Sequence, residues 1–228
     1  MERVSLRRVN EWDAPAMLKL YAPYIGTHAT PEELLPDLQC YIRRVDRYTY
    51  GLGWLICELA GEPAGFCRLF EDPAEPSNPF RLSVEIYVAA TQQRRGVGTA
   101  LMGLMTEIAR HGNRRRISAR VPLPNDGARA FFQKLGFSPE GVTKDAMEKH
   151  GVHYDAAVFS KVLTPEDPDA ERPIKPYLIP NPVYEAAKSK FSEELAEKQL
   201  AAGKGRGKVK GAEASCDEKE QKNRENKM

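Results

Sequence analysis

The segment that most constrains the fold is residues 83–110, in which an apolar strand passes through a short loop into a long amphipathic helix. The loop reads Gln93-Arg94-Arg95-Gly96-Val97-Gly98. Its two glycines allow a tight turn with exposed backbone N–H groups, and the helix N-terminus adds unsatisfied donors and partial positive charge. The two arginines add mobile positive charge. The segment therefore predicts a phosphate-binding loop between a strand and a helix.

Two common phosphate-binding motifs are excluded at this loop. A P-loop would need Gly-Lys-Ser/Thr, which does not follow here. A dinucleotide fingerprint would need a third glycine and an acidic residue about twenty positions further on, and both are missing. Gly-x-Gly alone is more often a tight turn, so the flanking strand, Gln-Arg-Arg and helix carry the prediction.

Apolar periodicity over residues 1–163 predicts an α/β domain. We expect strands at 4–8, 53–59, 64–70, 81–88 and 117–121, near 137 and at 154–163, and helices from Pro15, at 31–46, at 98–111 and at 128–135. The second helix is expected because Thr30-Pro31-Glu32-Glu33 reads as a capping box. This order predicts a mixed central β-sheet with helices on both faces.

The composition changes near residue 164. We expect residues 164–228 to form a proline-rich linker, a short helix and a charged, largely disordered tail, because so polar a segment cannot offset the entropy of ordering. The whole segment is therefore expected to add little to the core. Within it, a basic cluster at 203–211 could contact nucleic acid or act as a localisation signal, although a solvated flexible tract is the favoured interpretation.

An apolar stripe in this segment predicts a helix over 183–202. Its members are spaced three and four residues apart: Tyr184, Ala187, Phe191 and Leu195. The favoured interpretation is a helix that packs back on the domain or forms only marginally, and the alternative is a helix that binds a protein partner.

Composition also limits the class of protein. No run of about 18 apolar residues predicts a membrane helix, and the charged N-terminus does not resemble a signal peptide. The four separated cysteines predict reduced thiols, rather than disulfides or zinc ligands, in a cytoplasmic or nuclear protein. The net charge of +2 neither demands nor excludes a nucleic-acid partner.

Two motifs, at residues 93–98 and then at residues 125–137, resemble those of the GNAT superfamily of acyl-CoA-dependent N-acetyltransferases. The signature Gln/Arg-x-x-Gly-x-Gly/Ala matches at Gln93, Gly96 and Gly98, and residues 125–137 are similar to the family's Asn-x-x-Ala-x-x-Phe-Tyr-x-Lys-Leu-Gly-Phe segment. The resemblance spans residues 4–163. Residues 16–25 and 85–88 look most like the phosphinothricin acetyltransferase-like group.

The resemblance implies a GNAT-like fold and acetyl-CoA as co-substrate, without a metal. The family's loop binds the acetyl-CoA pyrophosphate through backbone N–H groups, and the preceding strand splays from its neighbour and pairs with the pantetheine amides. The implied cofactor-binding residues are Ile86, Tyr87, Val88, Gln93, Arg94, Arg95, Gly96, Val97, Gly98, Thr99 and Asn125. A larger side chain at position 96 is expected to intrude where the phosphate oxygens bind while leaving the fold intact.

Glu85 is the predicted catalytic base, because an amine must lose a proton to attack a thioester and this carboxylate lies in an otherwise apolar strand. In the phosphinothricin group the glutamate sits at the position of Ser83, about 7 Å away along a strand, so Glu85 would act through water. The alternative is a structural, ion-paired carboxylate. The family's usual acid, a tyrosine, corresponds to Phe132, which leaves Tyr87, Tyr154 and solvent as candidates.

The predicted activity is acetyl transfer to the primary amine of a small molecule, directly within a ternary complex. A protein N-acetyltransferase targeted by its tail and a non-catalytic acyl-CoA-binding module remain alternatives. We expect no membrane partner and no nucleic acid, and a homodimer remains open. The acceptor pocket is expected to come from residues 24–50 and 71–81.

Overall fold

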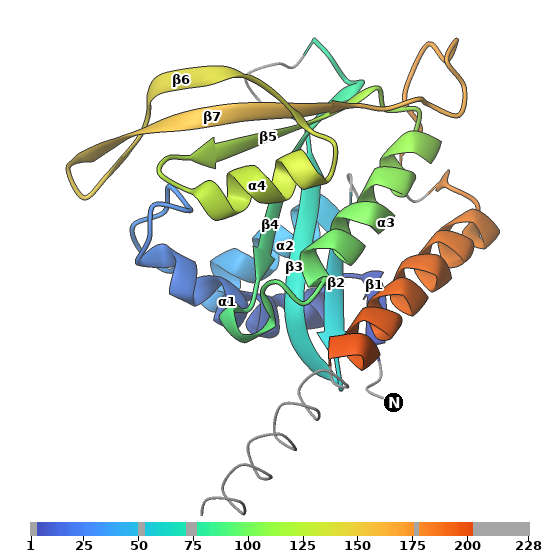
Figure 1. Ribbon diagram of the computed structural model, residues 1–228, viewed down its shortest axis with the longest axis horizontal. Coiled ribbons are helices and arrows are strands. Elements are labelled where there is room, and N and C mark those ends of the chain that lie inside the picture. Colours follow the sequence, from blue (N-terminus) through green and yellow to red (C-terminus); the bar gives the residue numbers. More distant parts are fainter. Residues whose placement is uncertain (1–3, 50–52, 72–76, 176–177, 203–228) are drawn as a thin grey trace, which may run out of the picture.

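The computed structural model describes residues 4–49, 53–71, 77–175 and 178–202. They form one mixed seven-stranded sheet in the order β1-β2-β3-β4-β5-β7-β6 (Figure 1). The strands are β1 (Val4–Arg8), β2 (Trp54–Leu59), β3 (Glu62–Phe70), β4 (Arg81–Val88), β5 (Arg116–Pro122), β6 (Ser138–Lys149) and β7 (Val152–Val162). The α-helices are α1 (Ala14–Ile25), α2 (Leu38–Thr49), α3 (Val97–His111) and α4 (Asp126–Lys134), with a further helix over 181–202. The predicted fold class and element order are confirmed.

Helices cover both faces of the sheet, and each layer has its own apolar core. On one face α1 and α2 pack around Tyr41, Ile56 and Phe66. On the other, α3 and α4 pack over the sheet with Leu101 and Leu104 fully buried. No helix in the described part of the chain is long and apolar enough to cross a membrane.

Strands β4 and β5 separate after a short pairing. They are parallel, as the crossover through α3 requires, and the other neighbouring strands described are antiparallel. Their pairing covers only Arg81–Ser83 against Arg116–Ser118. Among the described strands, residues 84–88 of β4 therefore have a neighbour only on the β3 side.

The predicted helix over 31–46 is wrong in its first turns. Residues 26–37 form a loop, and α2 begins at Leu38 with the side chain of Asp37 accepting the backbone N–H of Cys40 at 2.9 Å. The reason is Pro36, which lacks an N–H group and disfavours helical backbone at the residue before it. Residues of the missing turns do not join the core, since Leu34 is 82% exposed, whereas Tyr41 and Val45 within α2 are buried.

The apolar stripe of the helix over 181–202 packs against the domain. Tyr184 and Leu195 are buried in the same core as α3, and Phe191 and Ala187 pack against it. In Figure 1 this helix, in orange and red, lies along α3. The expectation that residues after 163 add little to the core is therefore wrong here, and the favoured interpretation, a helix packed on the domain, is confirmed. The predicted disordered end and the basic cluster at 203–211 lie outside the described residues.

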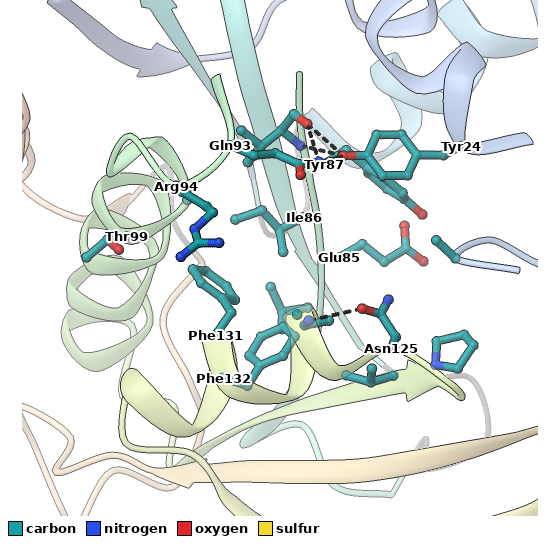
Figure 2. Close-up of a pocket in the computed structure, with 18 of the residues that line it drawn as sticks. Tyr24, Glu85, Ile86, Tyr87, Gln93, Arg94, Thr99, Asn125, Phe131 and Phe132 are labelled. Atoms are coloured by element: carbon teal, nitrogen blue, oxygen red, sulfur yellow. Dashed lines mark hydrogen bonds between the residues drawn. The ribbon is translucent and has the colours of Figure 1, made fainter. Parts of the chain in front are cut away.

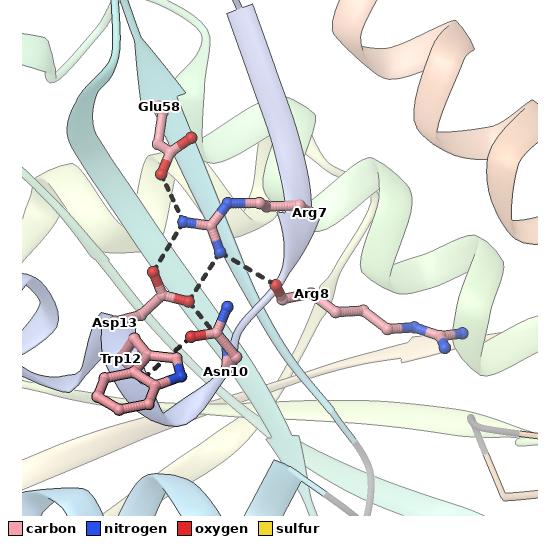
Figure 3. A network of polar contacts seen from close by, with 6 residues as sticks. All are labelled: Arg7, Arg8, Asn10, Trp12, Asp13 and Glu58. Carbon is pink, nitrogen blue, oxygen red and sulfur yellow. Dashed lines mark hydrogen bonds and ion pairs between the residues drawn. The ribbon is translucent and has the colours of Figure 1, made fainter.

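An arginine-centred network joins β1, β2 and the start of α1 (Figure 3). The Arg7 guanidinium donates to both carboxylate oxygens of Asp13 at 2.7 Å and to Glu58 at 2.5 Å. Asp13 also accepts the backbone N–H of Asn10 at 2.9 Å. Burial opposes the ionisation of Asp13, but these hydrogen bonds outweigh it and lower the pKa of its carboxyl group.

We expect Asp13→Asn to lower the free energy of unfolding by about 2 kcal/mol at pH 7, the usual size for a hydrogen bond to a charged group. Because the folded pKa is below the unfolded value of about 4, the wild-type advantage is complete above pH 4 and shrinks as the pH falls through the folded pKa. Urea unfolding at pH 7 and pH 3 measures both. Asp169→Asn, at an exposed position, is the control. An equal difference at both pH values would contradict the prediction.

Candidate active site

The parting of β4 from β5 opens a cavity of about 430 Å³. Residues 84–88 of β4 form one wall, residues 120–122 of β5 the opposite wall, and the loop before α3 and the start of α4 close the ends. Figure 2 shows these side chains converging from the four elements. Glu85 lines this cavity. So do nine of the predicted cofactor-binding residues, which are Ile86, Tyr87, Val88, Gln93, Arg94, Gly96, Gly98, Thr99 and Asn125.

The backbone of β4 presents alternate residues to the cavity. Ala89 donates its N–H to the carbonyl of Ala64 next to β3, at 2.9 Å. Since hydrogen-bonding direction alternates along an antiparallel pair, Tyr87 also faces β3, while Ile86 and Val88 turn their N–H and C=O groups to the gap. The backbone role expected for Tyr87 therefore does not fit this register, although its side chain lines the cavity.

Tyr24 of α1 was not identified from the sequence, yet its hydroxyl closes one end of this open edge (Figure 2). It donates to the Val88 carbonyl at 2.6 Å and accepts the Val88 N–H at 3.3 Å. The Gln93 side chain donates to the same hydroxyl at 3.3 Å. Helical spacing in α1 indicated a buried face but gave no sign that a tyrosine would reach across to β4.

The loop before α3 turns through two residues with left-handed backbone, Arg94 at φ 61° and Gly96 at φ 94°. Gly96 is the N-cap residue, so the first N–H groups of α3 begin beside the cavity. Val97 is 1% exposed, and its side chain belongs to the core rather than to the cavity wall. The Arg95 guanidinium turns back to Gln92 at 2.7 Å and also does not line the cavity.

The start of α4 forms the floor of the cavity. Asn125 is the N-cap of α4, and its side-chain oxygen accepts the N–H of Ala128 at 3.0 Å. The Phe131 ring lies 3.1 Å from where a side chain at Gly98 would begin, so a glycine at this position lets α3 and α4 approach. Phe132 lines the cavity, meets the Phe137 ring edge-to-face and stacks with Phe159 in the core.

A second, polar cavity of about 290 Å³ lies on the α1 and α2 face of β4. Its lining residues are Tyr21, Thr30, Pro31, Glu32, Arg44, Arg68, Glu85 and Tyr87. Residues 30–32 and 44 come from the region expected to build an acceptor pocket. None of the described residues within 71–81 contributes to it.

Two ion pairs line this polar cavity. Arg68 donates to Oε2 of Glu85 at 2.8 Å, and Arg44 lies 2.5 Å from Glu32. The other carboxylate oxygen of Glu32 is buried and has no hydrogen-bond partner among the described residues. The Glu85 side chain is 37% exposed, so it is both ion-paired and accessible.

Burial, with a smaller contribution from the charge of Glu85, raises the pKa of the Tyr87 hydroxyl well above its usual value. Tyr87 therefore keeps its proton at neutral pH, and burial makes its hydroxyl a weaker acid than an exposed tyrosine. Tyr154 stacks on His28 and lines neither cavity.

Comparisons with known proteins agree with this architecture. The family model described as "Acetyltransferase (GNAT) family" matches residues 14–137. Phosphinothricin N-acetyltransferase from Streptomyces viridochromogenes is 28% identical over 183 residues, which cover 76% of this chain and 94% of that protein. A phosphinothricin N-acetyltransferase from Alcaligenes faecalis is 28% identical over 170 residues, which cover 72% of this chain and 84% of that protein.

Solved structures share the fold. A phosphinothricin acetyltransferase from Sinorhizobium meliloti, solved in complex with AcCoA, superposes with a TM-score of 0.67 at 21% identity, covering 74% of this chain and 92% of that one. An acetyltransferase from Salmonella typhimurium, solved with its cofactor acetyl-CoA, superposes with a TM-score of 0.67 at 19% identity. The match covers 73% of this chain and 98% of that one.

We expect Gly96→Val to destabilise the fold, contrary to the expectation from sequence. A side chain here would begin 3.2 Å from Leu195 and 3.3 Å from Lys198, so it points to the helix over 181–202. Left-handed strain costs about 1–2 kcal/mol and overpacking about 1–3 kcal/mol. Urea unfolding measures the sum. Gly61→Val, at φ 86° with nothing within 4 Å, is the control for strain alone. Equal losses for the two variants would contradict the contact with the helix.

Proposed function

Since the chain belongs to the acetyltransferase (GNAT) family, we propose that it transfers the acetyl group of acetyl-CoA to the primary amine of a small molecule, directly, with both substrates bound together. The family match and the two phosphinothricin N-acetyltransferase relatives make it an N-acetyltransferase. The acetyl-CoA complexes of two proteins with the same fold support the choice of acyl donor.

The observation that carries the proposal is that Glu85 and Tyr87 line both cavities. One cavity has the open edge of β4 and the start of α3, which suit the amides and the phosphates of CoA. The other cavity is small and polar and suits an acceptor. The two side chains lie at the wall the cavities share, where a thioester and an amine would meet.

The acyl donor would lie along the gap between β4 and β5. Its pantetheine amides would pair with the backbone groups of Ile86, and with those of Val88 in place of the Tyr24 hydroxyl that contacts them in this structure. The pyrophosphate would face the loop from Gln93 to Thr99. Within that loop we assign the contacts to the backbone N–H groups, including that of Val97, and to the Arg94 side chain, because Arg95 turns away.

In the reaction, the amine nitrogen attacks the thioester carbonyl carbon, so a C–N bond forms and the C–S bond breaks. The proton lost by the amine goes to Glu85, directly or through a water molecule. The departing CoA thiolate takes a proton, for which we assign Tyr87 in place of the tyrosine that Phe132 replaces. This assignment rests on position, since the Tyr87 side chain lines both cavities, whereas its raised pKa makes the proton harder to release.

The polar cavity favours a compact, charged acceptor over a protein segment. Its volume of about 290 Å³ lies at the small end of the range for small-molecule sites. The unpartnered oxygen of Glu32 can accept an N–H group, and the nearby arginines Arg44 and Arg68 can offset negative charge on the acceptor. The phosphinothricin N-acetyltransferase relatives are consistent with such an acceptor.

A screen for CoA thiol release tests the proposal. The purified protein is incubated with acetyl-CoA and a panel of amino acids, their analogues, simple amines and peptides, and CoA binding is measured by calorimetry. We expect release with at least one small amine. Release with peptides alone would favour a protein acetyltransferase, and CoA binding without any release would favour a non-catalytic module.

With the amine found in that screen, we expect Glu85→Gln to lower turnover by a factor of about 10² to 10⁴ while acetyl-CoA affinity is kept. The change keeps the size of the side chain and removes the proton acceptor. The loss should shrink at high pH, where more of the amine is already neutral.

The matched control is Glu58→Gln, which alters an ion-paired glutamate on β2 that lines neither cavity. It should leave turnover unchanged. Full turnover of Glu85→Gln near neutral pH would make Glu85 a structural partner of Arg68 and not the base.

A further inference from the structure

We propose that Gln199, in the helix over 181–202, is a positioning residue that holds the Arg95–Gly96 peptide in the orientation that binds the pyrophosphate of the acyl donor. This inference rests on the proposed function. It assigns a role in the cofactor site to a segment that the sequence places outside the catalytic domain.

The contact itself is buried. Gln199 is 7% exposed, and its side-chain nitrogen donates to the carbonyl oxygen of Arg95 at 2.7 Å. A carbonyl oxygen can only accept, so chemistry fixes which end of the carboxamide faces the loop. The hydrogen bond joins residues 104 positions apart, the last turn of the helix and the turn before α3.

Peptide geometry makes this hydrogen bond orient the loop. Among the described residues the only cis peptide is Leu123–Pro124, so the Arg95–Gly96 peptide is trans. In a trans peptide the C=O and N–H groups point in opposite directions. With the Arg95 carbonyl held toward the helix, the Gly96 N–H points away from the helix, and Gly96 lines the cavity in which the phosphates would lie.

The helix is seated closely enough to hold this orientation. Leu195 is 1% exposed, and its Cδ1 would lie 3.2 Å from a Cβ atom at Gly96. Phe191 sits so closely against Gly103 of α3 that a side chain added there would have to displace its ring. The loop is therefore supported from behind by packed side chains, with Gln199 as the hydrogen-bond donor.

Replacing Gln199 should change the orientation of the loop without changing the stability of the protein. The Gln199 Oε1 atom is buried with no hydrogen-bond partner among the described residues, so its loss of contact with water destabilises the folded state. Gln199→Leu removes that unsatisfied oxygen and leaves the Arg95 carbonyl without its donor. These two changes oppose each other, so we expect little change in the free energy of unfolding, whereas the peptide loses its fixed orientation.

The test compares acyl donors with and without phosphates. For Gln199→Leu we expect CoA to bind about five- to tenfold more weakly, the value of about one hydrogen bond. The ratio kcat/KM for acetyl-CoA should fall by the same factor, with the KM of the acceptor unchanged. Turnover of S-acetylpantetheine, which lacks the phosphates, should not change. Gln199→Met is of similar length, uncharged and unable to donate, so it should behave like Gln199→Leu and replaces it if that variant does not fold.

The control is Tyr184→Phe on the same helix, which removes a buried hydroxyl that also lacks a partner among the described residues but lies away from the loop. It should bind CoA like the wild type. Equal CoA affinity in wild type and Gln199→Leu would overturn this inference alone. Equal losses with acetyl-CoA and S-acetylpantetheine would show a general structural role and overturn it too. Absence of CoA binding in the wild type would overturn the proposed function itself.

Discussion

The separation of β4 from β5 after Ser83 is the constraint on which the site depends. A strand that loses its neighbour leaves N–H and C=O groups that must find other partners. At Val88 the hydroxyl of Tyr24 supplies both contacts. The rest of the gap is the larger cavity, with a polar backbone edge on one side and apolar side chains such as Phe131 below. Such a gap suits a ligand that is itself extended and carries amides.

Because residue directions alternate along a strand, the side chains and the backbone groups of β4 face different parts of the site. Side chains two residues apart share a face, so Glu85 and Tyr87 both lie toward α1 and α2, where the polar cavity is. The backbone groups of Ile86 and Val88 face the gap instead. In the proposed reaction, β4 would bind the acyl donor through its backbone groups and the acceptor through its side chains, so the two roles would use different atoms.

Local patterns predicted most of the fold, and what they missed has specific structural causes. The bounds of β4 and the start of α3 follow from strand alternation and from the glycines of the loop, and the family prediction is confirmed. The capping box at Thr30 failed because Pro36 blocks the helix that it would have opened, and Thr30 bonds to Tyr21 instead. The inward turn of Arg95 toward Gln92 could not be predicted from a motif that specifies residue types and not side-chain directions.

Two separate physical reasons favour glycine at position 96, and the sequence motif indicates only the first of them. Its positive φ would favour glycine in any chain with this turn. Here the helix over 181–202 adds a second requirement, because Leu195 and Lys198 occupy the space that a side chain would need. The same helix holds the carbonyl of the preceding residue through Gln199. The shape of the loop is thus set from both sides of the domain boundary predicted at residue 163, so a change that loosens this helix also loosens the N-terminus of α3.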